Sequence, residues 1–581
     1  MIKYLLHKKI PLAFIIFFIT SNVYGLYDTT KQETYDDLSL KDLLNIKIVS
    51  VSKKPEWLFD APLSASVITK DDIRKAGSTS IMEALRLVPG MIAREQNNGN
   101  YDIHIRGMDN VPPNAPFDGN ATTTLVMIDN RPIYNYLKGG TFWETLPVDL
   151  NDIEKIEVVR GPAAALYGPN AVSGVINIIT RQPQKEGLYL VANAKQGGNQ
   201  SFINNASVGY QSNKWNMVAS GNYQHRNRTQ TSYFEMYRNR WIDHPAFFIG
   251  LLGNTLLNIN EMYPNPALAM QKYAGNIFLN FVPSEKTRFN LKTGAQHSVV
   301  QTVSTENGVT PFTTVLSDSK YVDLRAAIKG ITAQVSYNQG TQKTNSGAQN
   351  KYYFCTFDAN AEYNYIRDNF SLKPGLSYRS AIYDDTKYSG ISLKNGYFNS
   401  RGIITTLSAS LRGEYNSFKD KLRLVAGFSA NKFNYPDSTY ISYQLAATTP
   451  DAPRDAIQPN PALNNIYSGL GITVAVKSTP VIFGGAVINY LLTKKLNGNM
   501  SAYYYSNQTY FHVSNVAFHD GIRGIEHINA KLIMNVNLSY EPVKSMIVSC
   551  SSKNILNNIS REFFKADDVP FMLLAGINYE F

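Results

Sequence analysis

The stretch Ile153–Thr180, IEKIEVVRGPAAALYGPNAVSGVINIIT, decides how this chain of 581 residues is interpreted. Its two ends, 153–160 and 175–180, are rich in β-branched residues, which is typical of strands. Between them, Gly161-Pro162 and Gly168-Pro169 break the chain twice, with small residues in the turn. The stretch therefore predicts a compact strand–turn–strand unit.

The whole region before Gly187 predicts a small mixed α/β domain. Ser80 and Glu83 have the spacing of a capping box, and the helix that they begin is expected to end at Pro89-Gly90. Further strands are expected at residues 102–106 and 125–128, before the two strands of the 153–180 stretch.

The N-terminus predicts a secretory signal peptide that is cut after Gly25. Lys3, Lys8 and Lys9 precede an apolar run, residues 10–19, and small residues follow it. A membrane anchor is the alternative, but the run is shorter than the roughly 18 apolar residues that a spanning helix needs.

Composition favours an outer-membrane barrel over a water-soluble protein. The mean hydropathy of −0.23 suits both, because lipid-facing and lumen-facing residues of a barrel strand alternate and cancel. The 37 tyrosines favour the barrel, whose membrane interfaces are lined with aromatic residues. The net charge of +11 is scattered along the chain and indicates no nucleic-acid partner. The two cysteines, Cys355 and Cys550, support neither a disulfide framework nor a metal site.

After Gly187, alternating strands and polar turns follow one another to the C-terminus. The segments 202–210 and 215–223, for example, flank a turn at Ser212-Asn213-Lys214. In the last strand every second residue is apolar, and the chain ends on an aromatic residue; this face holds Phe571, Leu573, Ala575, Ile577, Tyr579 and Phe581. The pattern predicts a mostly β fold, a transmembrane antiparallel β-barrel.

Several motifs in order resemble the TonB-dependent outer-membrane receptors. Those of the plug domain are Ala84–Gly90, Ile105-Arg106-Gly107, Leu125–Asp129 and the 153–180 stretch, and those of the last barrel strands are Gly524–Glu526, Lys553–Asn557 and the final strand. The resemblance implies a barrel of 22 strands with an N-terminal α/β plug in its lumen. The domains expected from it are a signal peptide at 1–25, a periplasmic segment at 26–52, the plug at 53–186 and the barrel at 187–581.

The resemblance also implies a location and partners. The protein is expected in the outer membrane of a Gram-negative bacterium, surrounded by outer-membrane lipid. Tyr579 and Phe581 are expected to form the assembly signal that the barrel assembly machinery reads.

A segment for energy coupling is expected just before the plug. An outer membrane has no ATP or ion gradient of its own, and family members draw work from the periplasmic TonB energy-coupling complex through a short strand added to TonB. The matching TonB box here lacks Gly and Pro and consists of Ile46, Lys47, Ile48, Val49, Ser50, Val51 and Ser52. The alternative is that this segment is the first internal strand of the plug.

Two arginines are expected to latch the plug to the barrel. Arg106 and Arg160 are followed by Gly107 and Gly161, and in the family such plug arginines are thought to pair with acids of the wall. Glu526 is a candidate partner. The alternative is that both arginines are merely solvated in a wet lumen.

Ligand contacts are expected from three apical plug segments, 94–100, 108–123 and 134–143. The residues singled out in them are Arg94, Asn110, Tyr134, Tyr136 and Trp143. The eight histidines show no metal-ligand spacing, and no cofactor is expected. His512, His519 and the 460–463 segment leave haem as a minority option.

The function expected is active import of a scarce small molecule, a ferric siderophore or a similar metal complex, into the periplasm. Haem or cobalamin import is an alternative, and so is a passive plugged barrel or adhesion channel. No P-loop, GxGxxG, GxSxG or HExxH motif is present, so an enzyme is not expected.

Overall fold

The computed structural model describes much of the chain from Lys47 onward. The described residues are 47–48, 56–57, 64–105, 123–133, 140–161, 167, 171, 173–181, 186–235, 238, 240–243, 245–249, 256–303, 310, 312–345, 349–367, 369–388, 401–417, 422–434, 482–493, 495–513 and 523–580. The predicted signal peptide lies outside them.

A five-stranded mixed sheet forms the centre of the plug, in the order β3-β8-β9-β6-β7. Its strands are β3 (Ser64–Thr69), β6 (Thr124–Ile128), β7 (Arg131–Pro132), β8 (Ile153–Arg160) and β9 (Gly174–Thr180). β8 and β9 pair antiparallel, which confirms the predicted strand–turn–strand unit, and β9 runs parallel to β6. A Cβ at Gly174 would lie 2.2 Å from the Val159 carbonyl oxygen, so this close approach requires glycine.

Short helices flank the plug sheet. They are α3 (Lys70–Lys75), α4 (Ile81–Ala84) and the 3₁₀ turns η4 (Leu85–Leu87), η5 (Trp143–Thr145) and η6 (Leu150–Asp152). The predicted helix after Ser80 therefore forms as α4 and η4. Ser80 Oγ accepts a hydrogen bond from the Glu83 N–H, as a capping box requires. The second half of the predicted box does not form, because the Glu83 carboxylate instead accepts hydrogen bonds from Thr79.

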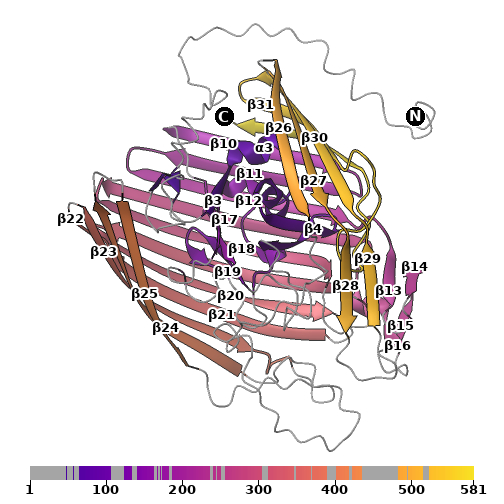
Figure 1. The fold of residues 1–581 in the computed structure, drawn as a ribbon, viewed down its shortest axis with the longest axis horizontal. Coiled ribbons are helices and arrows are strands. Elements are labelled where there is room, and N and C mark those ends of the chain that lie inside the picture. Colours follow the sequence, from indigo (N-terminus) through magenta and orange to yellow (C-terminus); the bar gives the residue numbers. More distant parts are fainter. Residues whose placement is uncertain are drawn as a thin grey trace, which may run out of the picture. The chain divides into compact units, whose positions relative to one another are not determined.

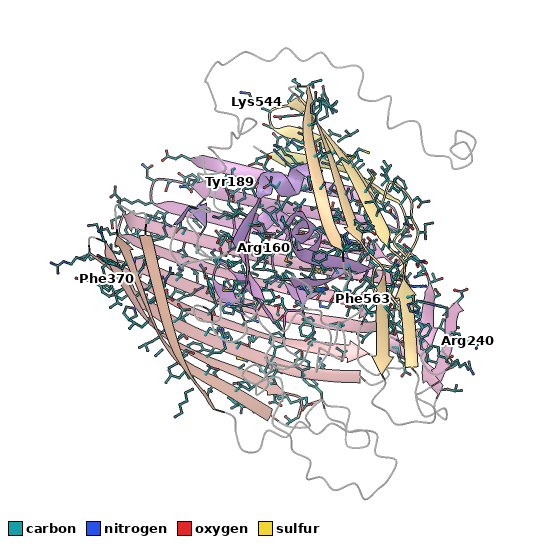
Figure 2. The ribbon with its side chains drawn as sticks, viewed as in Figure 1. Arg160, Tyr189, Arg240, Phe370, Lys544 and Phe563 are labelled. Atoms are coloured by element: carbon teal, nitrogen blue, oxygen red, sulfur yellow. The ribbon has the colours of Figure 1, made fainter. Side chains whose placement is uncertain are left out.

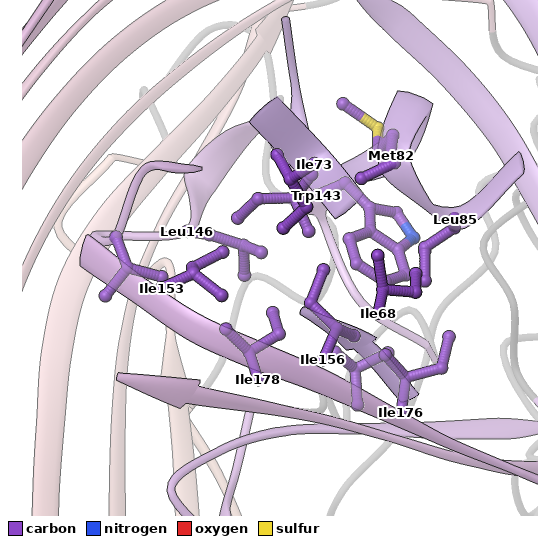
Figure 3. Packing of buried hydrophobic residues seen from close by; sticks show 14 of the residues in the cluster. Ile68, Ile73, Met82, Leu85, Trp143, Leu146, Ile153, Ile156, Ile176 and Ile178 are labelled. Carbon is purple, nitrogen blue, oxygen red and sulfur yellow. The ribbon is translucent and has the colours of Figure 1, made fainter. Parts of the chain in front are cut away.

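The plug core packs between this sheet and the helices. Figure 3 shows Trp143 among Ile73, Met82 and Leu85, beside the isoleucines that β8 and β9 contribute. These side chains are almost wholly buried. Strands β4 (Met91–Asn97) and β5 (Asn100–Ile105) form a separate antiparallel hairpin, whose turn is at Asn98-Gly99.

The second sheet is the barrel, and Figure 1 shows strands β17 to β21 side by side within it. Its strands are β10 (Gly187–Gly197), β11 (Ser201–Gln211), β12 (Trp215–Asn227), β17 (Leu268–Ser284), β18 (Thr287–Val303), β19 (Phe312–Ile328), β20 (Ile331–Asn345), β21 (Gln349–Tyr363), β22 (Tyr365–Arg367), β23 (Phe370–Asp384), β24 (Arg401–Ser417), β25 (Leu422–Asn434), β26 (Phe483–Thr493), β27 (Leu496–Tyr505), β30 (Lys531–Val543), β31 (Met546–Lys553) and β32 (Met572–Glu580). They are ordered as in the sequence, and β32 pairs with β10 to close the barrel. A mostly β fold with an antiparallel barrel is thus confirmed.

The number of strands is lower than expected among the described residues. These contain 17 strand segments of the barrel, and two of them, β21 and β22, pair with the same strand, β23. The expected number was 22. Residues 435–481, between β25 and β26, lie outside the described ranges.

Side chains along the barrel strands alternate between buried and exposed. On β32, Leu573, Ile577 and Tyr579 are exposed, as the pattern of the last strand predicts, and Leu574 between them is buried. Phe581 lies outside the described residues. On neighbouring strands Trp215 stacks on Phe281 with 4.1 Å between ring centroids. The barrel therefore has an apolar outer face and a polar inner face.

The two ends of the barrel differ in their connections. Short turns join the strands at one end, for example at residues 285–286 and 329–330. The connections at the other end hold the hairpins β13-β14 (Ser232–Glu235 and Arg240–Asp243), β15-β16 (Phe247–Ile249 and Leu256–Asn258) and β28-β29 (Gln508–Val513 and Arg523–Ile528), with helix α6 (Ile259–Met262). Figure 2 shows Arg240 and Phe563 at this end and Phe370 at the end with short turns. Because short turns of outer-membrane barrels face the periplasm, the long connections face outward.

No helix within the described ranges is both long enough and apolar enough to cross a membrane.

Candidate functional site

The tip of the β4-β5 hairpin is fastened to the barrel wall near the long connections. Asn98 Nδ2 donates to Ser201 Oγ at 3.0 Å and to the Asn227 carbonyl oxygen at 2.9 Å. Asn100 Nδ2 donates to the Ala269 carbonyl oxygen at 3.4 Å. The tip thus contacts the ends of β11, β12 and β17 and is held by side-chain amides.

Gly99 lets the tip approach a buried arginine of the wall. Its φ is +95°, and a Cβ there would lie 2.9 Å from Arg226 Cδ, so a side chain would be both strained and crowded. Arg226 Nη2 donates to the Thr79 carbonyl oxygen at 2.6 Å, and Nη1 donates to Thr79 Oγ1 at 3.1 Å. Arg226 therefore ties the start of α4 to the same part of the wall.

Arg94 lies in the middle of β4 and is fully buried. Its Nε and Nη2 donate to Asp102 Oδ2 on β5 at 3.0 and 2.5 Å, and its Nη1 donates to Gln508 Oε1 of β28 at 2.9 Å. The guanidinium also lies over the Phe563 ring, 4.9 Å from its centroid. Arg94 was expected in an apical loop that contacts ligand. Instead it connects the hairpin to the long connections of the barrel, which are called the outer connections from here on. The expectation was wrong because 94–100 is mostly strand rather than loop.

Glu562, between β31 and β32, is a second connection between plug and barrel. Its carboxylate pairs with the Arg86 guanidinium of η4 and accepts the Glu95 N–H of β4 at 2.9 Å. Both side chains of the Arg86–Glu562 pair are buried. The Lys531 ammonium of β30 lies 3.6 Å from the other oxygen of Glu562.

Glu83 of α4 makes a third connection, to β31. Lys553 Nζ lies 2.8 Å from Glu83 Oε1 and also donates to Thr79 Oγ1 at 2.9 Å. Burial alone would raise the pKa of Glu83, but the Lys553 ammonium and the hydrogen bonds from Thr79 outweigh it and lower the pKa to about 2. The carboxylate is therefore ionised at any physiological pH.

Two further sets of ion pairs lie elsewhere on the plug. Lys292 Nζ of β18 is 2.6 Å from Asp129 Oδ2, which follows β6. Near the short turns, Glu580 of β32 pairs with Lys70 of α3, at 3.1 Å, and with Arg181. The Glu580 pairs are partly exposed, whereas those of Glu83 and Glu562 are not.

The predicted latch differs from these contacts. Arg160, which Figure 2 shows among the plug strands, donates to the Pro89 carbonyl oxygen at 2.6 Å and to Ser66 Oγ at 3.0 Å, both within the plug. Glu526 accepts the Lys565 N–H at 2.7 Å, so its carboxylate faces the neighbouring connection of the barrel. Arg160 and Glu526 therefore do not pair with each other as predicted, because Arg160 ends β8 and its side chain lies along the plug's own sheet. Arg106 and Gly107 lie outside the described residues, and Gly161 follows β8 with a φ of +122°.

Trp143 is also placed differently from the expectation. It was predicted to contact ligand, but only 7% of it is exposed, and it belongs to the plug core. A large apolar indole gains more by burial in that core than by exposure at the plug surface. Asn110, Tyr134 and Tyr136 lie outside the described residues.

Two residues of the predicted TonB box are described. Lys47 and Ile48 form β1 (Lys47–Ile48), which pairs antiparallel with β2 (Glu56–Trp57). Ile46 and residues 49–52 lie outside the described residues. The short pairing shows that β1 is extended and capable of ladder hydrogen bonds.

Aromatic side chains from the outer connections cluster around this part of the plug. The buried cluster contains Tyr233, Phe248, Ile259, Met262, Tyr263, Val303, Phe312, Tyr510, Ile528, Phe563, Phe564 and Ala566. Cations lie on its rings: the Arg228 guanidinium is 4.2 Å from the Tyr233 centroid, and Lys565 Nζ is 5.7 Å from that of Phe564. Arg228 also pairs with buried Asp567, whose backbone N–H donates to the Gln96 carbonyl oxygen of β4. The outer connections are thus bonded directly to the plug hairpin.

Within the described part of the chain, no three His, Cys, Asp or Glu side chains come together in an arrangement that could hold a metal ion.

Comparison with known proteins agrees with this architecture. Residues 57–175 match the model of the TonB-dependent Receptor Plug Domain. The same segment is the one that the structure fastens inside a barrel closed by β32 and β10. The chain thus carries the plug domain of the TonB-dependent receptors.

Curated relatives of this receptor match over a limited part of their length. It is 31% identical over 193 residues to the ferric enterobactin receptor PirA of Pseudomonas aeruginosa, a match that covers 30% of this chain and 24% of that protein. It is 30% identical over 135 residues to the vitamin B12 transporter BtuB of Vibrio vulnificus, which covers 23% of this chain and 20% of that protein. The chain thus matches these relatives over about a quarter of their length or less.

Solved structures share the fold of the receptor over most of its length. The ferric enterobactin receptor PfeA of Pseudomonas aeruginosa aligns with a TM-score of 0.62 at 13% identity, over 92% of this chain and all of that one. The copper transporter OprC aligns with a TM-score of 0.53 at 12% identity, over 89% of this chain and 98% of that one. The family match and the outer-membrane relatives place the receptor in the outer membrane of a Gram-negative bacterium. They also bear out that it is not an enzyme, since members of this family are transporters.

The residues that connect the plug of this receptor to its barrel were not found from the sequence. A signal for one of them existed, because the Asn-Gly pair at residues 98–99 is a strong hairpin signal and would have placed a turn there. No local signal marks Arg86 or Glu562, which are 476 residues apart in the chain.

Proposed function

We propose that this receptor actively imports a scarce ligand, a ferric siderophore or a similar metal complex, across the outer membrane into the periplasm, using work supplied by TonB. The observation that carries the proposal is the way the plug is held. Buried ion pairs and hydrogen bonds fasten it to the wall near the outer connections, while an extended segment, β1, precedes it.

This arrangement suits transport driven by mechanical work. Breaking a buried ion pair costs about 3–5 kcal/mol, so several such pairs keep the plug in place without an external force. A periplasmic partner that adds a strand to the segment at 46–52 could apply that force to the plug. The same contacts link the plug hairpin to the outer connections, where a ligand arrives.

The ligand class rests on the relatives. PirA and PfeA are ferric enterobactin receptors, and this supports a ferric siderophore; BtuB and OprC, named for vitamin B12 and copper, keep other metal complexes as alternatives. We therefore expect one ligand of this class to bind well below micromolar concentration. Intrinsic fluorescence of the refolded protein, titrated with ferric siderophores, haem and cobalamin, measures it.

A proline in the coupling segment tests the mechanism. Val49→Pro removes a backbone N–H and blocks strand addition, so it is expected to abolish uptake of the bound ligand and leave its affinity unchanged. Lys47→Ala is the matched control: it alters only a side chain, and uptake is expected to persist. Unchanged uptake by Val49→Pro would contradict active import and favour a passive plugged channel.

A further inference from the structure

The outer face of the barrel carries a groove that the proposed transport does not use. It has a volume of about 550 Å³ and crosses strands β17 to β21. Tyr273 and Lys320 line it, and Tyr273 is 48% exposed on the same face of β17 as the exposed Ile277. Because exposed apolar side chains on barrel strands face lipid, the groove opens toward the membrane.

The groove lies where the outer face changes from apolar to polar. Three successive rows of paired residues cross the strands here. Counted toward the long connections, they are Ile277, Thr293, Val322, Tyr337 and Phe357, then Gly275, Ala295, Lys320, Gln339 and Cys355, and then Tyr273, His297, Asp318, Thr341 and Tyr353. The groove thus sits at the outer edge of the apolar band, the level of lipid headgroups in the outer leaflet.

The floor of the groove is made of small residues. A Cβ at Gly275 would meet only the Ser220 carbonyl oxygen, at 3.7 Å, so the space above this residue is open. Ala295 lies opposite Gly275 on β18. The floor leaves room for a group between the Tyr273 ring and the side chain of Lys320.

The charged side chains in the lining of the groove are Lys320 and Asp318, and His297 lies beside them. His297 stacks on Tyr273 with 4.8 Å between ring centroids, and its Nδ1 lies 2.7 Å from Asp318 Oδ1, which leaves Nε2 for another partner. One row farther out, Lys343 and Lys351 lie opposite each other on β20 and β21. Like charges in this position destabilise a sheet unless an anion lies between them. Among the described residues, no carboxylate forms an ion pair with Lys320, Lys343 or Lys351.

We propose that this groove binds an outer-leaflet lipid whose headgroup carries two phosphates. One phosphate would lie between Lys320 and the Nε2 side of the His297 ring, and the other would lie between Lys343 and Lys351. Lys320 and Lys351 are two strands apart and offset by four residues along the strands, about 16 Å between their backbones, which is too far for a single phosphate to bridge. The acyl chains would lie on the apolar rows toward the short turns, such as Ile277 and Val322.

This proposal concerns the lipid-facing wall and does not rest on ligand import. The test is native mass spectrometry of the full-length protein in detergent, titrated with diphosphorylated lipid A, its monophosphorylated form or phosphatidylcholine. The wild type is expected to retain diphosphorylated lipid A most strongly. Inorganic phosphate at the same concentration is not expected to displace it.

Two kinds of variant separate charge from shape. The triple variant K320A/K343A/K351A is expected to weaken binding of diphosphorylated lipid A about a hundredfold, since each lysine near an anionic lipid surface contributes about fivefold to the affinity. The control K214A/K286A/K544A removes three exposed lysines from the short turns at the other end and is expected to bind as the wild type does. Gly275→Leu keeps every charge but fills the groove, and it too is expected to weaken binding.

The proposal fails if the control triple variant loses as much affinity as the groove variant, because the attraction would then depend on net charge alone. Equal binding of the monophosphorylated lipid would overturn the two-phosphate assignment. Displacement by inorganic phosphate would indicate a site for a soluble anion instead. If the triple variant does not fold, Lys320→Gln and Gly275→Leu decide: unchanged affinity in both overturns the groove.

Discussion

Glu83 shows how much the plug depends on single buried contacts. It lies in a four-residue helix, and its carboxylate is shared between Thr79 and the Lys553 ammonium of β31. Neither partner follows from the local pattern, which predicts that this carboxylate returns to the backbone of Ser80. The contact with Lys553 makes the residue a connection between plug and barrel.

Glu83→Gln is expected to loosen the plug. The substitution leaves the Lys553 ammonium buried without its counter-charge, which costs about 3–5 kcal/mol. The measurement is the conductance of the protein in planar bilayers as urea is added, since displacement of the plug opens the pore. The Glu83→Gln variant should reach high conductance at a lower urea concentration than the wild type. Lys70→Ala, which removes a partly exposed pair with Glu580, is the control and should cost about 1 kcal/mol or less. Equal effects of the two variants would contradict the role given to burial.

The pH dependence of the same contact has a defined sign. The pKa of Glu83 is lowered from 4.5 to about 2, so its stabilisation is fully present above pH 4.5 and is lost as the pH falls to about 2. The urea concentration that opens the wild-type barrel should fall across this window. The Glu83→Gln variant should lack this part of the pH dependence, and a variant that retains it would show that other groups are responsible.

Trp143→Ala tests the corrected position of this tryptophan. Removing the buried indole should cost the plug about 3–5 kcal/mol through the cavity that remains. Hydrogen exchange of β8 and β9 in the full-length protein should accelerate. Trp215→Ala is the matched control, since that indole is 49% exposed on the barrel, and it should leave exchange in the plug unchanged. Lost ligand affinity with normal exchange would instead restore the ligand-contact hypothesis.

At the scale of elements, α3 is packed tightly against the barrel. A Cβ at Gly77, just after α3, would lie 2.8 Å from Ser551 Oγ of β31, and Asn537 Nδ2 of β30 donates to the Lys75 carbonyl oxygen at 2.9 Å. The helix therefore cannot move without breaking contacts with two neighbouring strands. A plug that rearranges during transport must break them.

A disulfide between these elements is expected to stop transport. Gly77→Cys with Ser551→Cys brings two Cβ atoms within the separation that a disulfide needs, although the positive φ of residue 77 adds some strain. In a chain whose native cysteines are replaced, oxidation should abolish uptake and reduction should restore it, with ligand affinity unchanged in both states. Normal uptake by the oxidised form would show that α3 stays against β31 during transport.

At the scale of the molecule, plug and barrel make one unit through contacts distributed around the wall. The strands that hold the plug include β10, β12, β18, β30 and β31. Deleting residues 53–186, the proposed plug, should therefore leave an open pore. Single-channel conductance should be high for the deletion variant and low for the full-length protein; a low conductance in both would contradict the role of the plug as the barrier.

Much of this architecture could be predicted without the structure. The paired strands β8 and β9, the outward face of β32 and the change from an α/β to an all-β region all follow from local periodicity, glycines and turns. Such patterns report on neighbours in sequence. They also carry the resemblance to the receptor family, because the motifs keep their order along the chain.

The contacts that hold the plug could be decided only by the tertiary structure. Arg86 meets Glu562 and Glu83 meets Lys553 because the barrel's register and the path of α4 and η4 bring them together across more than 400 residues. Arg160 and Glu526, chosen from motif position, face other partners for the same reason. The sequence by itself determined which elements form and in what order. The packing of those elements decided which charges are buried together, since electrostatic pairing depends on distance in space and not on position in the chain.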